Sequence, residues 1–344
     1  MIIDAERDRH LRTLNEIPAL LSSREKKVKF HGAVFSPGEE TLGALRKAAK
    51  LLPVEFTVYG SAPDVAEIES LLGDTCYEFI QTKDSVRELS QYLSVERSVR
   101  DKPVHFVLRG DFLSLDDTYR AISLTGSAGD VTGATSIGAF SGKTASESTP
   151  KSATTEKPFL SHVAVLEAAS QARVLVVSDG FVNPRPDIKT RLAIIKNALR
   201  VCKTIGISYP RVALLAAVEQ VYAGMPVTVE SEEIAKMSAA GEITGAHVDG
   251  PLSFDVALVE QVAKDKGAIG EVAGRADLLV GSSIEVANGI YMAQTMLARA
   301  NAASVVVGGK APLALPFPSD CIDNIFFSMC LACLISTNGV ASTA

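Results

Sequence analysis

Polar side chains follow one apolar strand of the expected sheet, at the point where that strand ends. Residues 174–178 read VLVVS, and Asp179, Gly180 and Asn183 come directly after them. In an open parallel sheet, ligands bind just past the carboxyl ends of the strands. Asp179 and Asn183 are therefore candidates for substrate binding, although an ordinary turn capped by Asp and Asn uses the same residue types.

Two later segments repeat this arrangement. Asp249 ends an expected strand, a Gly-Pro pair turns the chain, and Asp255 stands near the start of the next helix. Residues 276–281 form a further apolar run, and Glu285 and Asn288 follow it one helical turn apart, which places them on one face of a helix. Taken singly, each segment also fits a helix start whose acidic residue complements the helix dipole.

The elements that must position these residues alternate along the chain. Continuous apolar runs suit strands that are buried on both faces of a parallel sheet, and the segments between them, such as 188–205 and 256–266, have helical apolar spacing. Strand and helix in turn predict an α/β fold. We expect strands at residues 54–60, 104–110, 174–178, 212–218, 246–249, 276–281 and 304–308. We expect a helix in the first thirty residues, and a mobile interdomain loop at 141–157.

Composition narrows the class of protein. The chain has 344 residues, enough for two domains, and 47% of them are hydrophobic. A net charge of -6 argues against a nucleic-acid partner, and no apolar segment reaches the length that spans a bilayer. The charged amino terminus has no signal-peptide pattern. The five cysteines show no paired metal spacing, and the Cys330/Cys333 pair is expected to pack within a helix; a cytoplasmic protein fits these features.

Four blocks of the sequence, taken together, resemble the phosphate acetyl/butyryltransferase family (phosphotransacetylase and phosphotransbutyrylase). They are LSHVAVLE at 160–167, SDGFVNPRPD at 178–187, the segment 242–255 and the segment 284–288, in the family's order and at similar spacing. The likeness runs from about residue 159 to 316 and is nearer to the butyryl branch.

The resemblance implies a fold like that of the isocitrate and isopropylmalate dehydrogenases. Two α/β/α domains would enclose an active-site cleft. The first would be discontinuous, with residues 1–155 plus 304–344, and the second would be inserted at 156–303. The resemblance also implies a homodimer.

The resemblance further implies an acyltransferase that interconverts acyl-CoA plus phosphate with acyl phosphate plus CoA. A short-chain acyl group of the acetyl or butyryl type is expected, with CoA as a substrate and no metal or tightly bound cofactor. Such chemistry needs a proton acceptor for the thiol, donors for an oxyanion and cations for phosphate. The residues expected to bind substrate are Ser161, His162, Asp179, Asn183, Arg185, Asp249, Asp255, Glu285, Asn288 and Cys321.

The expected catalytic loop departs from the family. Family members carry a Ser-Arg pair where this chain has Phe317 and Pro318, and proline offers neither charge nor a donor. Smaller departures are Ala287 for a glycine and the 282–283 Ser-Ser pair for Pro-Asp. We take Asp320, beside Ser319, as the base for the thiol, and Asp323 as the second choice.

Three readings of this departure stay open. Another cation could take over: Arg185 is best placed, and the others are Arg109, Arg120, Lys157 and Lys310. Cys321 could accept the acyl group, although neighbouring carboxylates would blunt a thiolate. The protein could also bind CoA or acyl phosphate without turnover. A dehydrogenase is disfavoured because no GxGxxG motif follows a strand.

His162 follows Leu-Ser at what we take to be a helix start. There it could contact phosphate or act as a general acid, and a hydrogen-bonded structural histidine is the alternative.

Overall fold

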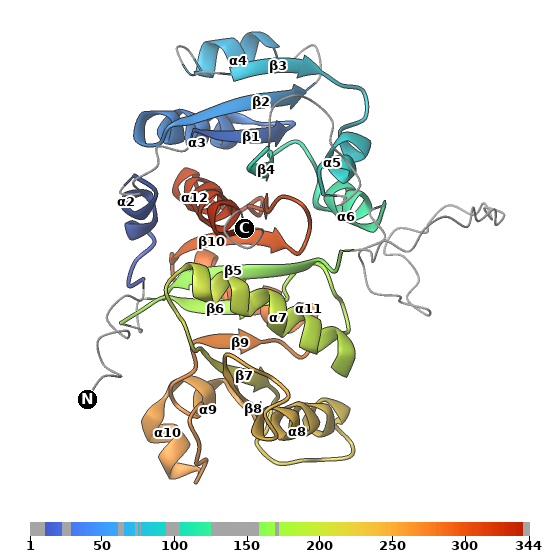
Figure 1. Cartoon of the computed structure of the whole chain (residues 1–344), viewed down its shortest axis with the longest axis vertical. Helices are drawn as coiled ribbons and strands as arrows, with labels where there is room; N and C mark the ends of the chain where they lie inside the picture. Colours follow the sequence, from blue (N-terminus) through green and yellow to red (C-terminus); the bar gives the residue numbers. More distant parts are fainter. Residues whose placement is uncertain are drawn as a thin grey trace, which may run out of the picture.

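One mixed sheet runs through the whole molecule (Figure 1). A computed structural model describes residues 11–22, 29–60, 65–72, 75, 77–93, 104–124, 158–168 and 172–339. Its eleven-stranded sheet has the order β3-β2-β1-β4-β11-β10-β5-β6-β9-β7-β8. The strands are β1 (Phe30–Phe35), β2 (Val54–Gly60), β3 (Tyr77–Gln81), β4 (Phe106–Arg109), β5 (Ser161–Glu167), β6 (Leu175–Ser178), β7 (Arg211–Leu215), β8 (His247–Leu252), β9 (Leu278–Val280), β10 (Asn301–Val307) and β11 (Leu313–Ala314).

Helices cover both faces of this sheet. The described helices are α2 (Glu16–Ser22), α3 (Glu39–Leu51), α4 (Val65–Leu72), α5 (Ser85–Leu93), α6 (Leu115–Leu124), α7 (Ile188–Thr204), α8 (Pro226–Ala239), α9 (Phe254–Leu258), α10 (Glu260–Asp265), α11 (Ile284–Met292), the π-helix η2 (Ala293–Leu297) and α12 (Ile322–Gly339). One buried apolar cluster packs α2, α3, α7 and α12 on one face. A second packs α5, α6, α9 and α11 on the other. The α/β prediction is confirmed.

The strands at the ends of the sheet are parallel, but its centre is not. β5 pairs antiparallel with both β10 and β6, and β10 also pairs antiparallel with β11. β11 then pairs parallel with β4, so the chain returns to the amino-terminal strands after β10. The expectation of a purely parallel sheet was therefore wrong at the centre. β5 runs antiparallel to both of its neighbours, and the apolar composition of a strand does not specify its direction.

The predicted helix start at His162 was wrong as well. His162 is the second residue of strand β5, and the first six residues of that strand are buried. The segment carries alternating valines, and its strand form is stabilised by ladders to β10 and β6 on either side. Partners distant in the sequence decided this element, since β-structure depends on packing more than on local preference.

The expected helix at 256–266 is divided into α9 and α10. Val259 between them is extended, with φ -114° and ψ 107°. The carbonyls of Val256 and Ala257 accept hydrogen bonds from the backbone N–H groups of Gly274 and Ala276. A second segment of chain therefore takes two carbonyls that a continuous helix would use.

Two further expectations concern single segments. Cys330 and Cys333 are fully buried in α12, as predicted. The expected loop at 141–157 lies outside the described residues. No helix in the described part of the chain is long and apolar enough to cross a membrane.

Asp277 joins three strands at the edge opposite the strand ends that carry the candidate residues. It is 1% exposed and precedes β9. Its Oδ2 accepts hydrogen bonds from the backbone N and Nε of Arg211 at the start of β7, both at 2.9 Å. Its Oδ1 lies 3.0 Å from Nη2 of Arg173, just before β6. A carboxylate so buried is stable because two guanidinium groups and a backbone N–H surround it.

We expect Asp277→Ala to lower the free energy of unfolding by about 3 kcal/mol, because it leaves two partly buried guanidinium groups without their anion. Urea unfolding measures the change. Asp265→Ala is the matched control: this exposed aspartate at the end of α10 should change stability by less than about 0.5 kcal/mol. Equal effects of the two substitutions would contradict a structural role for Asp277.

Candidate active site

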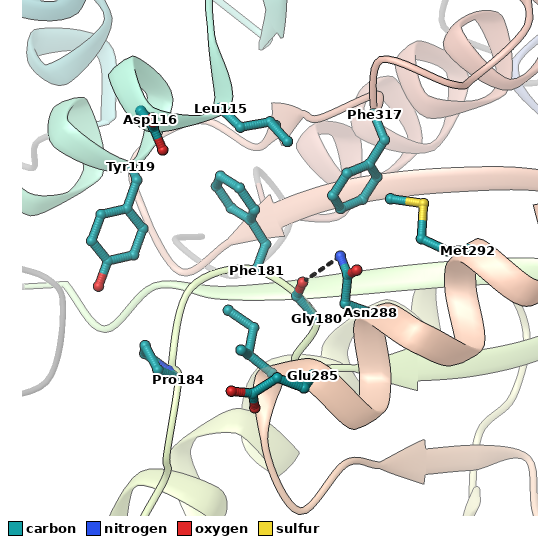
Figure 2. Close-up of a pocket in the computed structure, with 11 residues that line it drawn as sticks. Leu115, Asp116, Tyr119, Gly180, Phe181, Pro184, Glu285, Asn288, Met292 and Phe317 are labelled. Carbon is teal, nitrogen blue, oxygen red and sulfur yellow. Dashed lines mark hydrogen bonds between the residues drawn. The ribbon is translucent and has the colours of Figure 1, made fainter. Parts of the chain in front are cut away.

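A pocket of about 310 Å³ opens on the face of the sheet that α6 and α11 cover (Figure 2). Four segments form it: the amino-terminal part of α6, one side of α11 along its length, the loop after β6 and the loop after β11. The lining residues are Leu115, Asp116, Tyr119, Gly180, Phe181, Pro184, Ile284, Glu285, Asn288, Met292 and Phe317. None of these described residues is a cation. Among the described residues, no group of three or more His, Cys, Asp or Glu could hold a metal ion.

The loop after β6 is shaped by Asp179. This residue is 3% exposed, and its Oδ1 accepts hydrogen bonds from the backbone N–H groups of Phe181 and Val182, both at 2.9 Å. The side chain of Asn183 donates to its Oδ2 and also to the carbonyl of Leu160. Burial raises the pKa of Asp179, while these donors oppose the rise. Asp179 and Asn183 therefore hold the loop that presents Gly180 and Phe181 to the pocket.

His162 fixes the same loop from beneath. Its Nδ1 accepts a hydrogen bond from the backbone N–H of Gly180 at 3.2 Å, which leaves the ring proton on Nε2, 2.7 Å from Oγ of Ser304. The ring is 1% exposed and does not line the pocket. Burial lowers the pKa of His162 to about 3, so the imidazole is neutral at physiological pH. This geometry supports the structural alternative for His162.

Asp320 holds the loop after β11. Its Oδ2 accepts hydrogen bonds from Tyr291 Oη and from the backbone N of Phe317, both at 2.7 Å, and Asn324 donates to its Oδ1 at 3.2 Å. The carboxyl group is 6% exposed, and burial raises its pKa. Because both oxygens already have partners, the group orients Phe317 rather than facing the pocket.

Arg109 contacts this loop from the neighbouring strand. Nη1 of Arg109, at the end of β4, donates to the carbonyl of Pro316 at 2.8 Å. The side chain is 2% exposed, and its Nε has no hydrogen-bond partner. Burial lowers the pKa of Arg109, while the charges of Asp111 and Asp320 oppose the shift. Arg109, one of the five cations considered as a replacement for the family arginine, therefore lies beneath the loop after β11.

Glu285 and Asn288 are the two predicted residues that line the pocket. Asn288 Nδ2 donates to the carbonyl of Gly180 at 3.2 Å, which joins α11 to the β6 loop (Figure 2). A hydrogen bond from Ser283 and, to a smaller degree, the charge of Arg185 lower the pKa of Glu285. Arg185 is exposed and directly follows the lining residue Pro184. A cation therefore stands at the rim of the pocket beside an ionised carboxylate.

Ser319 and Cys321 flank Asp320 and are both exposed. Oγ of Ser319 lies 3.8 Å from Sδ of the lining residue Met292. Pro318 is also exposed, so the position of the family's arginine faces solvent. Neither Ser319 nor Cys321 lines the pocket.

Four predicted residues have other neighbours and do not line the pocket. Ser161 is fully buried and accepts a hydrogen bond from Asn197. The exposed Asp255 pairs with Lys266 at 3.3 Å, and the half-buried Asp249 accepts from the N–H of Gly250. Asp323 pairs with Lys47 of α3 at 2.7 Å.

Sequence reasoning missed most of the pocket wall. Tyr119 from α6 and Met292 from α11 carry no polar motif, and Phe181 lies inside a motif whose polar residues drew attention instead. Of the remaining cations, Arg120 pairs with Asp117, Lys310 is exposed after β10, and Lys157 lies outside the described residues. The sequence signal that could have found these wall residues was an aromatic residue close to the polar residues predicted in the loops after β6 and β11.

The fold and the pocket together define an α/β protein with a pocket on one face of its sheet, beside the amino termini of α6 and α11. Residues 120–333 match the family model described as phosphate acetyl/butaryl transferase, which is more than half of the chain. The chain belongs to the phosphate acetyl/butyryltransferase family.

Named relatives cover part of the chain. It is 38% identical over 179 residues to a phosphate butyryltransferase of Clostridium acetobutylicum, across 52% of this chain and 60% of that protein. It is 36% identical over 174 residues to a phosphate acetyltransferase of Thermotoga maritima, across 51% of this chain and 59% of that protein. The chain thus matches these relatives over about three fifths of their length.

Solved structures resemble the whole fold. A branched-chain phosphotransacylase from Enterococcus faecalis has a TM-score of 0.66 at 22% identity, covering 89% of this chain and 99% of its own. A phosphotransacetylase from Streptococcus pyogenes has a TM-score of 0.66 at 17% identity, covering 95% and 99%. At these identities the likeness establishes the fold alone.

The neutral, buried state of His162 predicts a pH dependence of stability. The unfolded histidine binds a proton below its ordinary pKa of 6.5, whereas the folded one does so only near 3. Between these values the unfolded state holds more protons, so the free energy of unfolding falls as the pH falls, by up to about 1.4 kcal/mol per pH unit.

Unfolding in urea between pH 7 and pH 4 tests this, with His162→Gln as the comparison. The wild type should lose stability more steeply than the variant below pH 6.5, because only the wild type carries the titrating ring. The buried carboxyl groups of Asp179 and Asp320 are present in both proteins, so their titration cancels. Parallel curves would contradict a neutral buried His162.

Proposed function

We propose that this chain transfers an acyl group between coenzyme A and inorganic phosphate. The observation that carries this proposal is the family match at 120–333, which contains the β6 loop, α11 and the β11 loop around the pocket. The phosphate oxygen would attack the thioester carbonyl, the carbon–sulfur bond would break, and the thiolate would leave as CoA. The reverse reaction would consume acyl phosphate.

The pocket offers an apolar interior for the acyl group and a polar rim for the phosphate. Phe181, Phe317 and Met292 form apolar walls. The amino termini of α6 and α11 open onto the pocket, where the positive end of each helix dipole favours an anion. Arg185 adds a positive charge at the rim, and this supports it as the replacement for the missing family arginine.

For the thiol proton we propose Glu285 in place of Asp320. Glu285 lines the pocket and is exposed, so its carboxylate reaches the cavity in which the thiol proton would be accepted. Asp320 is engaged by Tyr291, Phe317 and Asn324, so its role here is to position the loop.

The assembly follows from the same proposal. We infer a homodimer, and a division of the chain into a domain of residues 1–155 plus 304–344 and an inserted domain at 156–303. The return of β11 to pair with β4 supports this division. A cytoplasmic location stays a prediction from the sequence.

One observation favours a second candidate function, binding without turnover. Pro318 stands where the family has its arginine, and none of the described lining residues is a cation. A pocket that kept its shape but lost this charge would bind CoA thioesters and leave them intact.

Phosphate-dependent release of CoA from acyl-CoA thioesters separates the two candidates, followed with a thiol reagent beside a phosphate-free control. We expect release that requires phosphate, because Arg185 and two helix amino termini stand at the pocket. No release from protein that still binds CoA would favour the second candidate. In that event a gain of turnover in Pro318→Arg would identify the lost charge as the cause.

Arg185→Ala should raise the KM for phosphate about tenfold or more, because a charge-assisted contact to the anion is lost. Arg200→Ala is the matched control, since Arg200 is exposed at the other end of α7. Steady-state kinetics at saturating acyl-CoA measure the effect. An unchanged KM for phosphate in Arg185→Ala would remove Arg185 from the phosphate site.

A further inference from the structure

Aromatic rings dominate the wall of the pocket. Tyr119, Phe181 and Phe317 all line it, and Met292 adds a thioether beside them (Figure 2). The rings of Phe181 and Phe317 meet edge to face at 6.1 Å between centroids, and those of Tyr119 and Phe181 at 6.4 Å. Three rings from three different segments therefore converge on one cavity.

Phe317 is held rigidly in this wall. Its backbone N–H donates to Asp320 at 2.7 Å, and the preceding carbonyl of Pro316 accepts from Arg109 at 2.8 Å. Its ring packs against Tyr291 at 4.8 Å and edge to face on His162 at 5.8 Å. With 3% of its surface exposed, the ring cannot leave the wall without breaking a buried network.

The cavity is large for a small aliphatic acyl group. Its volume of about 310 Å³ corresponds to about ten water molecules, so an acetyl group would leave most of the apolar wall in contact with water. A larger apolar group would displace this water. Aromatic walls add a further preference, because ring pairs in edge-to-face geometry and thioether–ring contacts attract beyond the area they bury.

We propose that the pocket takes an acyl group that carries an aromatic ring, and that Phe317 determines this specificity. The inference rests on the proposed function, since it places the acyl end of a CoA thioester in the cavity. Where the family resemblance predicts a polar Ser-Arg pair, this chain has an apolar ring in the pocket wall at 317 and an exposed Pro318.

Isothermal titration of the full chain with benzoyl-CoA, cyclohexanecarbonyl-CoA and acetyl-CoA, without phosphate, tests this proposal. The first two thioesters have the same carbon skeleton and differ in aromaticity. Benzoyl-CoA should bind about 3- to 10-fold more tightly than cyclohexanecarbonyl-CoA. It should bind more than about tenfold more tightly than acetyl-CoA, because more apolar surface is buried.

Two variants assign the effect. Phe317→Leu keeps an apolar side chain and removes the ring, so the benzoyl preference over cyclohexanecarbonyl should shrink to about twofold or less. Phe254→Leu is the matched control, because this phenylalanine of α9 is partly exposed and does not line the pocket; its ratio should stay at the wild-type value.

The outcomes are distinguishable from those of the acyl-transfer assay. Equal affinity of wild-type protein for benzoyl and cyclohexanecarbonyl thioesters would overturn the aromatic specificity, even if turnover is found. A benzoyl preference without phosphate-dependent release would sustain this inference and overturn the transferase. A preference that survives Phe317→Leu would overturn the role of Phe317. Failure of every thioester to bind would overturn the inference and the proposed function together.

Discussion

The antiparallel pairing of β5 with β10 is the constraint on which the rest of this structure depends. These strands come from residues 161–167 and 301–307, and seven residue pairs join them, from Asn301 with Glu167 to Val307 with Ser161. β6 lies on the far side of β5, and β11 on the far side of β10. The loops after β6 and β11 leave opposite edges of the sheet, and Phe317 turns back across one face onto His162 and Phe181, so both loops line the same pocket. Backbone ladders buried on both faces leave no other partner for these groups, which makes the arrangement obligatory.

Buried polar groups then set the shape of each wall. Asp179 orders the β6 loop, His162 anchors it at Gly180, and Asp320 orders the β11 loop. A carboxylate in the interior is stable only when several donors surround it, and the donors here are backbone N–H groups of the loops together with the side chains of Asn183, Tyr291 and Asn324. The acidic residues that suggest acid–base chemistry in the sequence thus determine which neighbouring side chains reach the cavity. Glu285 differs from them, since it is exposed, ionised and at the pocket.

The loop after β11 belongs to the region that matches the phosphate acetyl/butyryltransferase family, and it also carries the expected departure at 317–318. This chain has Phe317 and Pro318 where the family resemblance predicts a polar pair, and Arg109 and Asp320 hold the loop by hydrogen bonds at Pro316 and Phe317. In the proposed site, Arg185 and the amino termini of α6 and α11 would supply the positive charge for an anion. Under the proposed function, the charge at the rim would face the phosphate of an acyl phosphate and the rings in the interior would face its acyl group.

Residue periodicity alone determined the α/β class, most strands of the two parallel regions and the burial of Cys330 and Cys333. Motif order determined the family, and Glu285 and Asn288 were predicted at the site because a strand end followed by a helix start is a local pattern. Tertiary structure decided the direction of β5 and β10, the strand form of the segment around His162 and the partners of Asp320 and Asp323. It also decided that Tyr119, Phe181 and Phe317 share one cavity. The physical reason is that periodicity and capping act over a few neighbouring residues, whereas strand direction and the packing of loops depend on segments distant in the sequence, as in the pairing of β5 with β10 and of His162 with Ser304.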